Sequence, residues 1–385
     1  MKLTERLRQY AADKEIDLLG ITNMEAISCI PWDYDKEPSH YLPCRTTQTG
    51  PDTYEPKQVM PEGKAIIVTG MYMYGFDKIQ PSVPGCPRGN IGPWTRGYVE
   101  AGRYATDRIE EFLKKEGYHT RFTNELPYRT LAVKCGMGKI GRNGFLFAPG
   151  MGCYIRLGAV VTDAPLETVD KGTKSEDVCG KCRVCVDACP TGALKGTNDM
   201  DADSCLHLWQ QGKGKYGDYL PPEERHKCGN YLMRTGRCLE VCVRNKKLIP
   251  RKHFPFQTEQ KEDSPELIPL VLASEEEYRK RLPVHVYKYG ISYIRRDAIM
   301  ALGNSKDKAA IGVLEKGLKI LGEKERGLCA WSLGEIGGPA ACEALKNALR
   351  TEKSSLVLKE IKRAIQQNRQ EEAGNEKGKI SGHRP

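Results

Sequence analysis

The sequence predicts a multidomain α+β protein, and three observations lead to this prediction. The chain has 385 residues, which is more than one ordinary domain core needs. Strand-like and helix-like apolar patterns alternate up to about residue 165, cysteines gather between 179 and 242, and an apolar pattern repeats near the C-terminus. We therefore expect an α/β domain, a cysteine-rich domain, a helical-repeat domain and a disordered polar tail. Their expected bounds are 1–165, 166–255, 271–368 and 369–385.

The first 165 residues carry the signals of alternating helices and strands. Residues 2–20 place apolar side chains at helical spacing, whereas the proline- and tyrosine-rich stretch 28–63 lacks periodicity and predicts a long loop over a pocket. Short runs of β-branched and apolar residues predict strands, and apolar positions at helical spacing predict further helices. The predicted strands are 64–69, 118–123 and 155–162, and the further helices are 98–117 and 126–134.

The strongest motif of the chain runs from Cys179 to Pro190. Its cysteines follow the pattern C-x2-C-x2-C-x3-C-P, which is the spacing of the bacterial ferredoxin loop. The first three cysteines of such a loop bind one [4Fe–4S] cluster, and the fourth binds a second one. A zinc site more often has two separated C-x2-C pairs. The motif therefore predicts a ferredoxin-like domain with two clusters and one-electron chemistry.

A second set of cysteines follows downstream, with a less regular spacing. Cys238 and Cys242 repeat the C-x3-C end of the first loop, but Thr235 stands where a complete loop would have its preceding cysteine. We expect Cys228 to replace it; the alternative is that Cys228 is an uncoordinated thiol. With the crossing rule applied, two ligand sets are predicted. They are Cys179, Cys182, Cys185 and Cys242 for one cluster, and Cys189, Cys205, Cys228 and Cys238 for the other.

The C-terminal region contains an internal repeat. Leu302 and Leu333 occupy matching positions that are 31 residues apart (333 − 302), and each is followed by a second apolar helical pattern. A third unit begins near Val357. Paired helices with this period are typical of an α-solenoid of the HEAT type, which leaves one face for binding.

The bulk composition argues against a membrane protein. The mean hydropathy is −0.55, 29% of the residues are charged, and we find no apolar run of about 18 residues. The N-terminal residues lack the pattern of a secretory signal, so we expect a cytoplasmic protein with reduced cysteines. The net charge is +10, and basic residues are concentrated between 213 and 252. These are a solvated face, or cations that balance anionic clusters, or a footprint for a phosphate backbone.

Three segments together resemble the epoxyqueuosine reductases. They are the glycine-rich stretch from Pro127 to Gly144, the stretch 156–163, and the end of the cysteine loop from Cys189 to Ala193, with the isolated Cys205 behind it. The resemblance implies a nitroreductase-like α/β domain that binds cobalamin beside two [4Fe–4S] clusters. It also implies reduction of an epoxide on a tRNA nucleoside in queuosine biosynthesis, with electrons from an external low-potential donor.

The resemblance also suggests site residues. Glycines let a backbone approach a flat macrocycle closely, and the expected cobalamin-binding residues are Lys134, Gly136, Gly138, Gly141, Arg142, Asn143 and Arg156. The family places an acidic aspartate at the position of Asn124, which cannot donate a titrating proton, so Glu125 is the candidate replacement. Cys135 and Cys153 are expected to be buried structural thiols.

Two other functions are compatible with the same motifs. The first is a related corrinoid and iron–sulfur reductase that acts on a different, smaller substrate, which the asparagine at position 124 favours. The second is an electron-transfer protein whose partner docks on the helical repeat. A bound corrin would exclude the pure carrier, and salt-sensitive tRNA binding would favour the tRNA enzyme.

Overall fold

The computed structural model divides the chain into two compact units. It describes residues 1–28, 53–75, 79–92, 97–123, 126–173, 177–196, 200–212, 214–233, 235–258, 261–287 and 290–381. Unit 1 comprises 1–77, 93–205 and 236–260, and unit 2 comprises 78–92, 206–235 and 261–385. The units are therefore interleaved along the chain. Residues 206–235, which the sequence assigns to the cysteine-rich domain, pack with the helical repeat instead.

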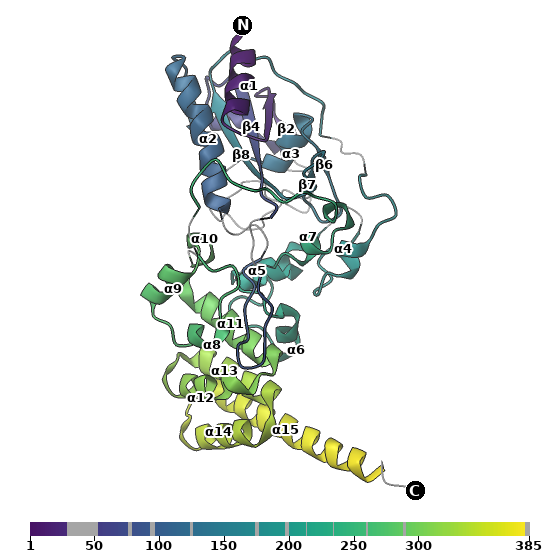
Figure 1. The fold of residues 1–385 in the computed structure, drawn as a ribbon, viewed down its shortest axis with the longest axis vertical. Coiled ribbons are helices and arrows are strands. Elements are labelled where there is room, and N and C mark those ends of the chain that lie inside the picture. Colours follow the sequence, from purple (N-terminus) through teal and green to yellow (C-terminus); the bar gives the residue numbers. More distant parts are fainter. Residues whose placement is uncertain are drawn as a thin grey trace. The chain divides into compact units, whose positions relative to one another are not determined.

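Unit 1 is built on a four-stranded antiparallel sheet (Figure 1). The strand order is β1 (Leu18–Thr22), β4 (Ala65–Tyr72), β8 (Ile155–Thr162) and β5 (Thr120–Phe122). The expectation of one helix over 2–20 was wrong, because α1 (Leu3–Asp13) ends early and β1 follows it. Glu15 adopts a positive φ of 53°, which a helix does not allow, and the chain reverses there.

Helices cover both faces of this sheet, and the alternation of side chains along β4 explains why. Ala65, Ile67 and Met71 pack with α1 and α2 (Tyr98–Lys115) in one apolar cluster. Ile66 and Val68 point to the opposite face and pack with α3 (Tyr128–Lys134). Two short pairs of antiparallel strands lie in the same unit. They are β2 (Ile27–Ser28) with β3 (Thr53–Tyr54), and β6 (Lys139–Ile140) with β7 (Leu146–Phe147).

Where the structure describes them, the cysteine-rich segments contain only short helical turns. Those in unit 1 are α4 (Val184–Asp187), η3 (Ala202–Ser204), α7 (Arg237–Glu240) and η5 (Val243–Asn245). Those in unit 2 are α5 (Leu206–Gln210), α6 (Pro222–Arg225) and η4 (His226–Cys228). Cys185 is buried and belongs to the same apolar cluster as side chains of the sheet and α3. The first cysteine loop is thus anchored on one face of the unit 1 sheet.

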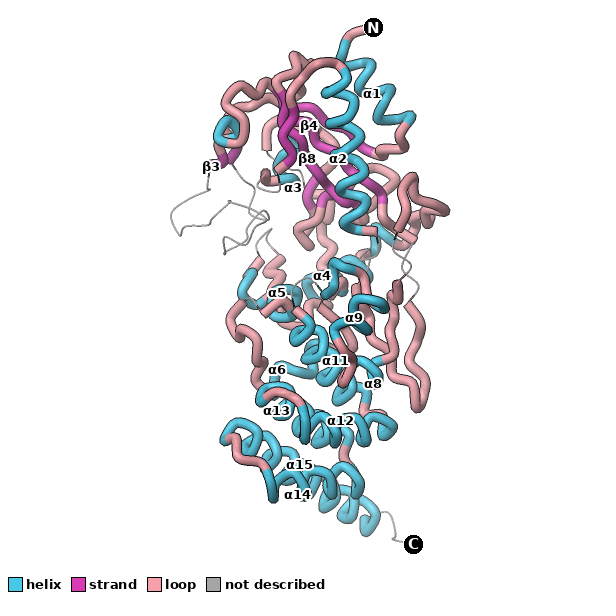
Figure 2. Tube along the Cα trace, turned by 90° about the vertical axis from the view of Figure 1, so that its left-hand side faces the viewer, coloured by secondary structure: helices cyan, strands magenta, loops and turns pink. Residues whose placement is uncertain are grey.

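Unit 2 is helical, and its long helices follow the predicted repeat (Figure 2). They are α11 (Ile291–Ser305), α12 (Ile311–Ile320), α13 (Glu323–Ile336), α14 (Gly338–Thr351) and α15 (Ser355–Ser381). Shorter helices precede them: α8 (Leu267–Leu270), α9 (Glu275–Arg281) and α10 (Val284–Tyr287). Matching glycines bring the helices close together, because a Cβ at Gly303 would lie 2.9 Å from Ser332 Cα and one at Gly334 would lie 2.8 Å from Ala364 Cβ.

Two further expectations concern the chain termini and the membrane. Disorder was expected from residue 369, but α15 continues to Ser381. Within the part of the chain that the structure describes, no helix combines the length and apolar character that a bilayer span requires.

Candidate iron–sulfur site

The first group of thiols comes together around Cys185. Burial, and then the neighbouring thiols of Cys179, Cys242 and Cys182, raise the pKa of Cys185 to about 11. Cys242 also raises the pKa of Cys179, after burial. The structure therefore brings Cys242, from the distant second loop, beside three cysteines of the first loop. This is the set that the crossing rule predicts for one cluster.

A second group of thiols surrounds Cys238. Burial, and then the thiols of Cys205, Cys185 and Cys189, raise the pKa of Cys238. The helical turns that carry Cys185 and Cys238, α4 and α7, pack against each other. The two groups are thus adjacent, as two clusters exchanging electrons require.

The arrangement of the thiols suits a cluster better than a single ion. No three His, Cys, Asp or Glu side chains among the described residues are grouped so that they could hold one metal ion. A [4Fe–4S] cluster binds each cysteine through a different iron, so its ligands surround a volume and do not converge on a point. Cluster binding also requires each cysteine to lose its thiol proton, because iron binds the thiolate form.

Cys228 belongs to unit 2, whereas the cysteines of both groups belong to unit 1. Its side chain is 1% exposed and packs in the apolar core of unit 2 with Leu232, Leu302 and other residues. Burial raises its pKa, and the charged groups acting on it are all in unit 2, with Asp297 the largest. Cys228 is therefore a core residue of unit 2, and its predicted role as a cluster ligand stays a prediction.

Arg142 holds the first cysteine loop. Its backbone N–H donates a hydrogen bond to Cys179 Sγ at 3.4 Å. Its guanidinium donates to the Gly180 carbonyl oxygen at 2.6 Å and pairs with Asp177 at 3.3 Å. Arg142 was predicted to bind cobalamin, and the structure places it as a support of the iron–sulfur loop. An N–H···S bond of this kind stabilises a bound thiolate and raises the cluster potential.

Two buried asparagines fix the second loop through Cys153. Asn143 Nδ2 lies 3.7 Å from Cys153 Sγ and 3.3 Å from the Cys238 carbonyl oxygen. Asn245 Nδ2 donates to Cys153 Sγ at 3.2 Å and to the Leu239 carbonyl oxygen at 2.9 Å. Cys153 is buried, as expected. Its hydrogen bond with Cys242 is the main cause that lowers the pKa of Cys242, which favours the thiolate.

The glycines of the 127–144 segment do not form an open cradle. A Cβ at Gly138 would lie 2.3 Å from the Phe147 carbonyl oxygen, and one at Gly141 would lie 2.3 Å from the Phe147 ring. Gly136 has a positive φ of 72° and faces the Lys171 side chain. These glycines let the β6–β7 hairpin close on itself, so the prediction that they lie against a macrocycle does not match their surroundings.

The two remaining predicted cofactor residues also have partners within unit 1. Lys134 is 4% exposed, donates to Asn23 Oδ1 at 2.9 Å and lies 3.2 Å from an Asp170 carboxylate oxygen. Arg156 donates to the Tyr98 carbonyl oxygen at 3.2 Å and stacks on the Tyr98 ring at 4.3 Å. Both side chains fasten neighbouring segments to the sheet.

Comparison with known proteins agrees with these motifs. A model of the 4Fe-4S double cluster binding domain matches residues 178–245, and a model of HEAT repeats matches residues 292–366. The epoxyqueuosine reductase of Bacillus subtilis is 30% identical over 384 residues, covering 95% of this chain and 96% of that protein. The chain belongs to the epoxyqueuosine reductase family.

Other epoxyqueuosine reductases support the same assignment. The Bacillus cereus protein is 31% identical and covers 81% of this chain and 83% of its own length. A crystal structure of an epoxyqueuosine reductase with an epoxyqueuosine-modified tRNA stem loop has a TM-score of 0.79 and 28% identity, and covers 95% of this chain and 99% of that chain. A structure from Bacillus subtilis with its catalytic loop swung out has a TM-score of 0.78 and 30% identity, covering 95% and 98%. The chain is accordingly an oxidoreductase.

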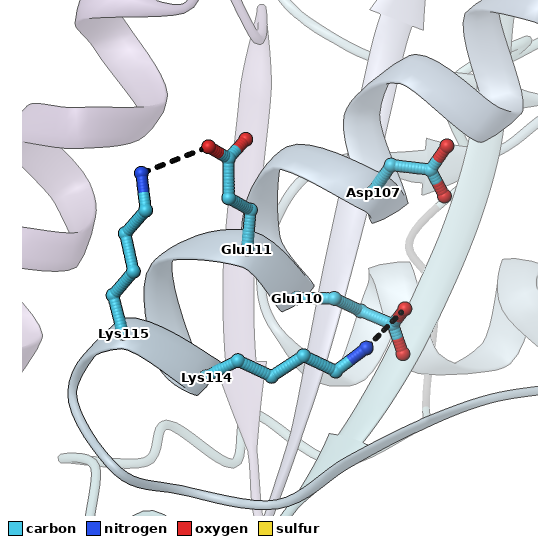
Figure 3. A pocket seen from close by; sticks show the side chains of 5 residues that line it. All are labelled: Asp107, Glu110, Glu111, Lys114 and Lys115. Atoms are coloured by element: carbon cyan, nitrogen blue, oxygen red, sulfur yellow. Dashed lines mark hydrogen bonds and ion pairs between the residues drawn. The ribbon is translucent and has the colours of Figure 1, made fainter.

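The two candidate catalytic residues of this reductase, Asn124 and Glu125, lie outside the described residues. One hollow that the structure does describe is an open surface on α2, lined by Asp107, Glu110, Glu111, Lys114 and Lys115 (Figure 3). Lys114 pairs with Glu110 at 3.3 Å and Lys115 with Glu111 at 2.9 Å. These are ordinary pairs one helical turn apart on a solvated face, so the hollow has no catalytic character.

Sequence reasoning missed the part that Asn245 plays. This residue is 4% exposed and bonds to both Cys153 and the α7 backbone. The signal that could have found it is its position three residues after Cys242, where an amide side chain can reach back to a cluster loop. Arg142 and Asn143, which were predicted to bind cobalamin, contact the two cysteine loops.

Proposed function

We propose that this chain reduces the epoxide of epoxyqueuosine in a tRNA, using electrons that pass through two [4Fe–4S] clusters to a cobalamin. The observation that carries the proposal is the family relationship, which extends over 95% of the chain at 30% identity. The two adjacent groups of cysteines supply the electron path that such a reduction needs. A solved relative with a tRNA stem loop supports the choice of substrate.

The thiols fit iron–sulfur clusters by type and grouping. We assign Cys179, Cys182, Cys185 and Cys242 to the first cluster, and Cys189, Cys205 and Cys238 to the second. The clusters supply single electrons when bound. The chain orients the first cluster through Arg142, which holds both Cys179 and the Gly180 backbone, and it fixes the second loop through Asn143 and Asn245.

We further infer that the α/β part of unit 1 is nitroreductase-like and binds the cobalamin. Bound cobalamin would supply low-valent cobalt, the reductant that the reaction needs. Gly138 and Gly141 do not fit as its cradle, since their free faces are filled by Phe147. The inference of a cobalamin therefore stands on family membership, and its direct measure is the cobalt and corrin content of the purified protein.

Opening an epoxide also needs a proton at the departing oxygen. Asn124 has no titrating proton, so we assign the acid role to Glu125. A Glu125→Gln variant should then lose turnover while it keeps wild-type iron and cobalt. Glu167→Gln, which removes an exposed carboxylate paired with Lys2, is the matched control. Undiminished turnover in Glu125→Gln would remove this residue from the mechanism.

The tRNA contact is assigned to basic residues that follow the second cysteine loop. Arg244, Lys246, Lys247 and Lys252 are exposed in unit 1. By contrast, Arg225 and Arg251 of the same basic stretch are engaged, with Glu360 at 2.6 Å and Asp17 at 2.5 Å respectively. The phosphate footprint suggested by the sequence is therefore narrower than the full basic stretch.

The experiment that tests the function starts with anaerobic purification, followed by iron, cobalt and corrin quantification. Conversion of an epoxyqueuosine-containing tRNA stem loop is then measured with a low-potential chemical reductant. For the partner, we expect Lys246→Glu with Lys247→Glu to weaken stem-loop binding and to lower the slope of log affinity against log salt by about 1 per lost phosphate contact. Lys115→Glu, on the outer face of α2, is the charge-reversal control.

The outcomes separate the candidate functions. Corrin with turnover of the tRNA stem loop supports the proposal. Corrin without tRNA binding points to a reductase of another, smaller substrate, which the asparagine at position 124 favours. Iron without corrin points to an electron-transfer protein.

A further inference from the structure

The two cysteine loops have the same backbone conformation. Arg183, before α4, has φ −127° and ψ 7°, and Gly236, before α7, has φ −123° and ψ 14°. After the turns, Ala188 has φ −86° and ψ −4°, and Val241 has φ −80° and ψ −9°. Residues of the first loop thus correspond to residues of the second at an offset of 53 (236 − 183).

The hydrogen bonds of the two turns agree with this correspondence. The Val186 N–H donates to the Arg183 carbonyl at 2.9 Å, as the Leu239 N–H donates to the Gly236 carbonyl at 2.8 Å. Near the other end, the Cys189 N–H donates to the Val186 carbonyl at 3.2 Å. The matching bond, from the Cys242 N–H to the Leu239 carbonyl, is also 3.2 Å. The same offset pairs Cys185 with Cys238 and Cys189 with Cys242.

The offset pairs Cys182, a ligand position of the first cluster, with Thr235. Chain connectivity keeps Thr235 three residues before Cys238, within about 11 Å of it at full extension. Thr235 Oγ1 is buried and has no hydrogen-bond partner among the residues that the structure describes. A buried hydroxyl without a hydrogen bond costs free energy of folding unless a group outside the chain, such as a cofactor or a water, bonds to it.

Cys228 does not supply the missing thiolate. Its side chain is 1% exposed and belongs to the unit 2 core, with Leu220, Leu232 and Met233 in the same apolar cluster. The Cys228 thiol is enclosed by side chains of this cluster, so binding an iron would require unpacking the core around it. It is therefore an apolar packing residue.

We propose that the second cluster has three cysteine ligands, Cys189, Cys205 and Cys238, and that its fourth iron, at Thr235, takes an oxygen ligand in place of a thiolate. This inference rests on the proposed function, because it takes the two clusters as given. The oxygen ligand is the Thr235 hydroxyl or a water that this hydroxyl positions.

The fourth iron, which lacks a thiolate ligand, gives the cluster a specific chemistry. An iron without a thiolate is the one that leaves when the cluster is oxidised by one electron. The balanced step is [4Fe–4S]2+ → [3Fe–4S]+ + Fe2+ + e−, with the electron taken by an added oxidant such as ferricyanide. The first cluster, with four cysteines, resists this loss. Mild oxidation should therefore convert one cluster per chain and leave the other intact.

The test uses the full chain, reconstituted anaerobically and then treated with ferricyanide in small excess. Iron and sulfide are counted before and after, and EPR spectra are recorded for the [3Fe–4S]+ signal. Thr235→Cys restores a thiolate ligand for the fourth iron of the second cluster. Cys228→Ala removes the alternative ligand, with Cys329→Ala, another buried thiol of the unit 2 core, as its packing control.

We expect the oxidised wild type to lose one iron per chain and to show the [3Fe–4S]+ signal. Thr235→Cys should keep that iron and lose the signal, whereas Cys228→Ala should behave as the wild type and as Cys329→Ala. The proposal is overturned if the oxidised wild type keeps all its iron, or if Cys228→Ala alone lowers the iron content. Two oxidation-resistant clusters would refute this inference and leave the proposed function standing, whereas a reconstituted chain without iron would overturn both.

Discussion

The buried ion pair between Arg225 and Glu360 gives the sharpest test of how unit 2 is held together. Arg225 is 0% exposed, and its guanidinium reaches both Glu360 oxygens, at 2.6 and 3.0 Å. The Arg225 Nε–H also donates to the Leu220 carbonyl, and the Tyr219 hydroxyl donates to Glu360. The pair joins the 206–235 segment to helix α15, so its loss should loosen that connection.

Glu360→Gln keeps the side-chain shape but leaves the arginine charge buried without its counter-ion. Removing one partner of a buried pair costs about 3–5 kcal/mol. For a unit of this size, each kcal/mol lowers Tm by about 2–4 °C, so we expect a fall of about 6–20 °C in the helical transition. Replacing both partners together, as Arg225→Met with Glu360→Leu, should recover much of that stability, because the desolvation cost disappears as well.

The assay is anaerobic thermal and urea unfolding followed by far-UV circular dichroism. Asp218→Asn is the matched control, because Asp218 also ties the 206–235 segment to a helix of the repeat, pairing with Lys324 of α13 at 2.7 Å, but both side chains are 51% exposed. We expect that variant to lose less than about 1 kcal/mol. Equal losses in Glu360→Gln and Asp218→Asn would show that burial does not set the energy of these pairs and would refute the reasoning.

Two further predictions concern the helical repeat. Arg326 lowers the pKa of Glu352 from 4.5 to about 2. The pair therefore stabilises the fold above pH 4.5, and its contribution of at most about 3 kcal/mol is lost as the pH falls through 2. Glu352→Gln should remove this pH dependence from a series of urea midpoints, and an unchanged series would contradict the prediction. Gly303→Ala should destabilise by about 1–3 kcal/mol because its Cβ would strike Trp331, whereas Gly312→Ala, whose Cβ meets nothing within 4 Å, should stabilise by about 0.5–1 kcal/mol in the same unfolding assay.

The features that the sequence predicted well are those with local, repeated signals. Residue spacing alone is enough to recognise the loop from Cys179 to Cys189 and the 31-residue period. The family models match both regions. Three of the predicted strands and the helix over 98–117 also match the structure closely. In these cases the period of apolar residues reports directly on which side of an element is buried.

The features that were missed depend on contacts between distant residues. Nothing in residues 206–235 indicates that this segment packs with the helical repeat, because the attraction comes from pairs such as Met233 with Asp297 and Arg225 with Glu360. The strand Leu18–Thr22 was read as the end of a helix, since its hydrogen-bond partner, β4, lies more than 40 residues away in the sequence. Similarly, Gly138 and Gly141 lie in a glycine-rich stretch that is typical of a ligand loop, but Phe147 fills the space beside them.

Comparison of the two cysteine loops shows which of their residues the backbone conformation requires and which only the cluster chemistry requires. The backbone of each turn is fixed by its own N–H···O bonds, and the second turn keeps this geometry with threonine where the first has cysteine. A thiolate at position 235 is therefore not required for the loop to form. Its replacement changes only the ligand that the loop offers to a cluster. This departure alters the chemistry without altering the scaffold, so the fold alone does not decide how this reductase handles its electrons.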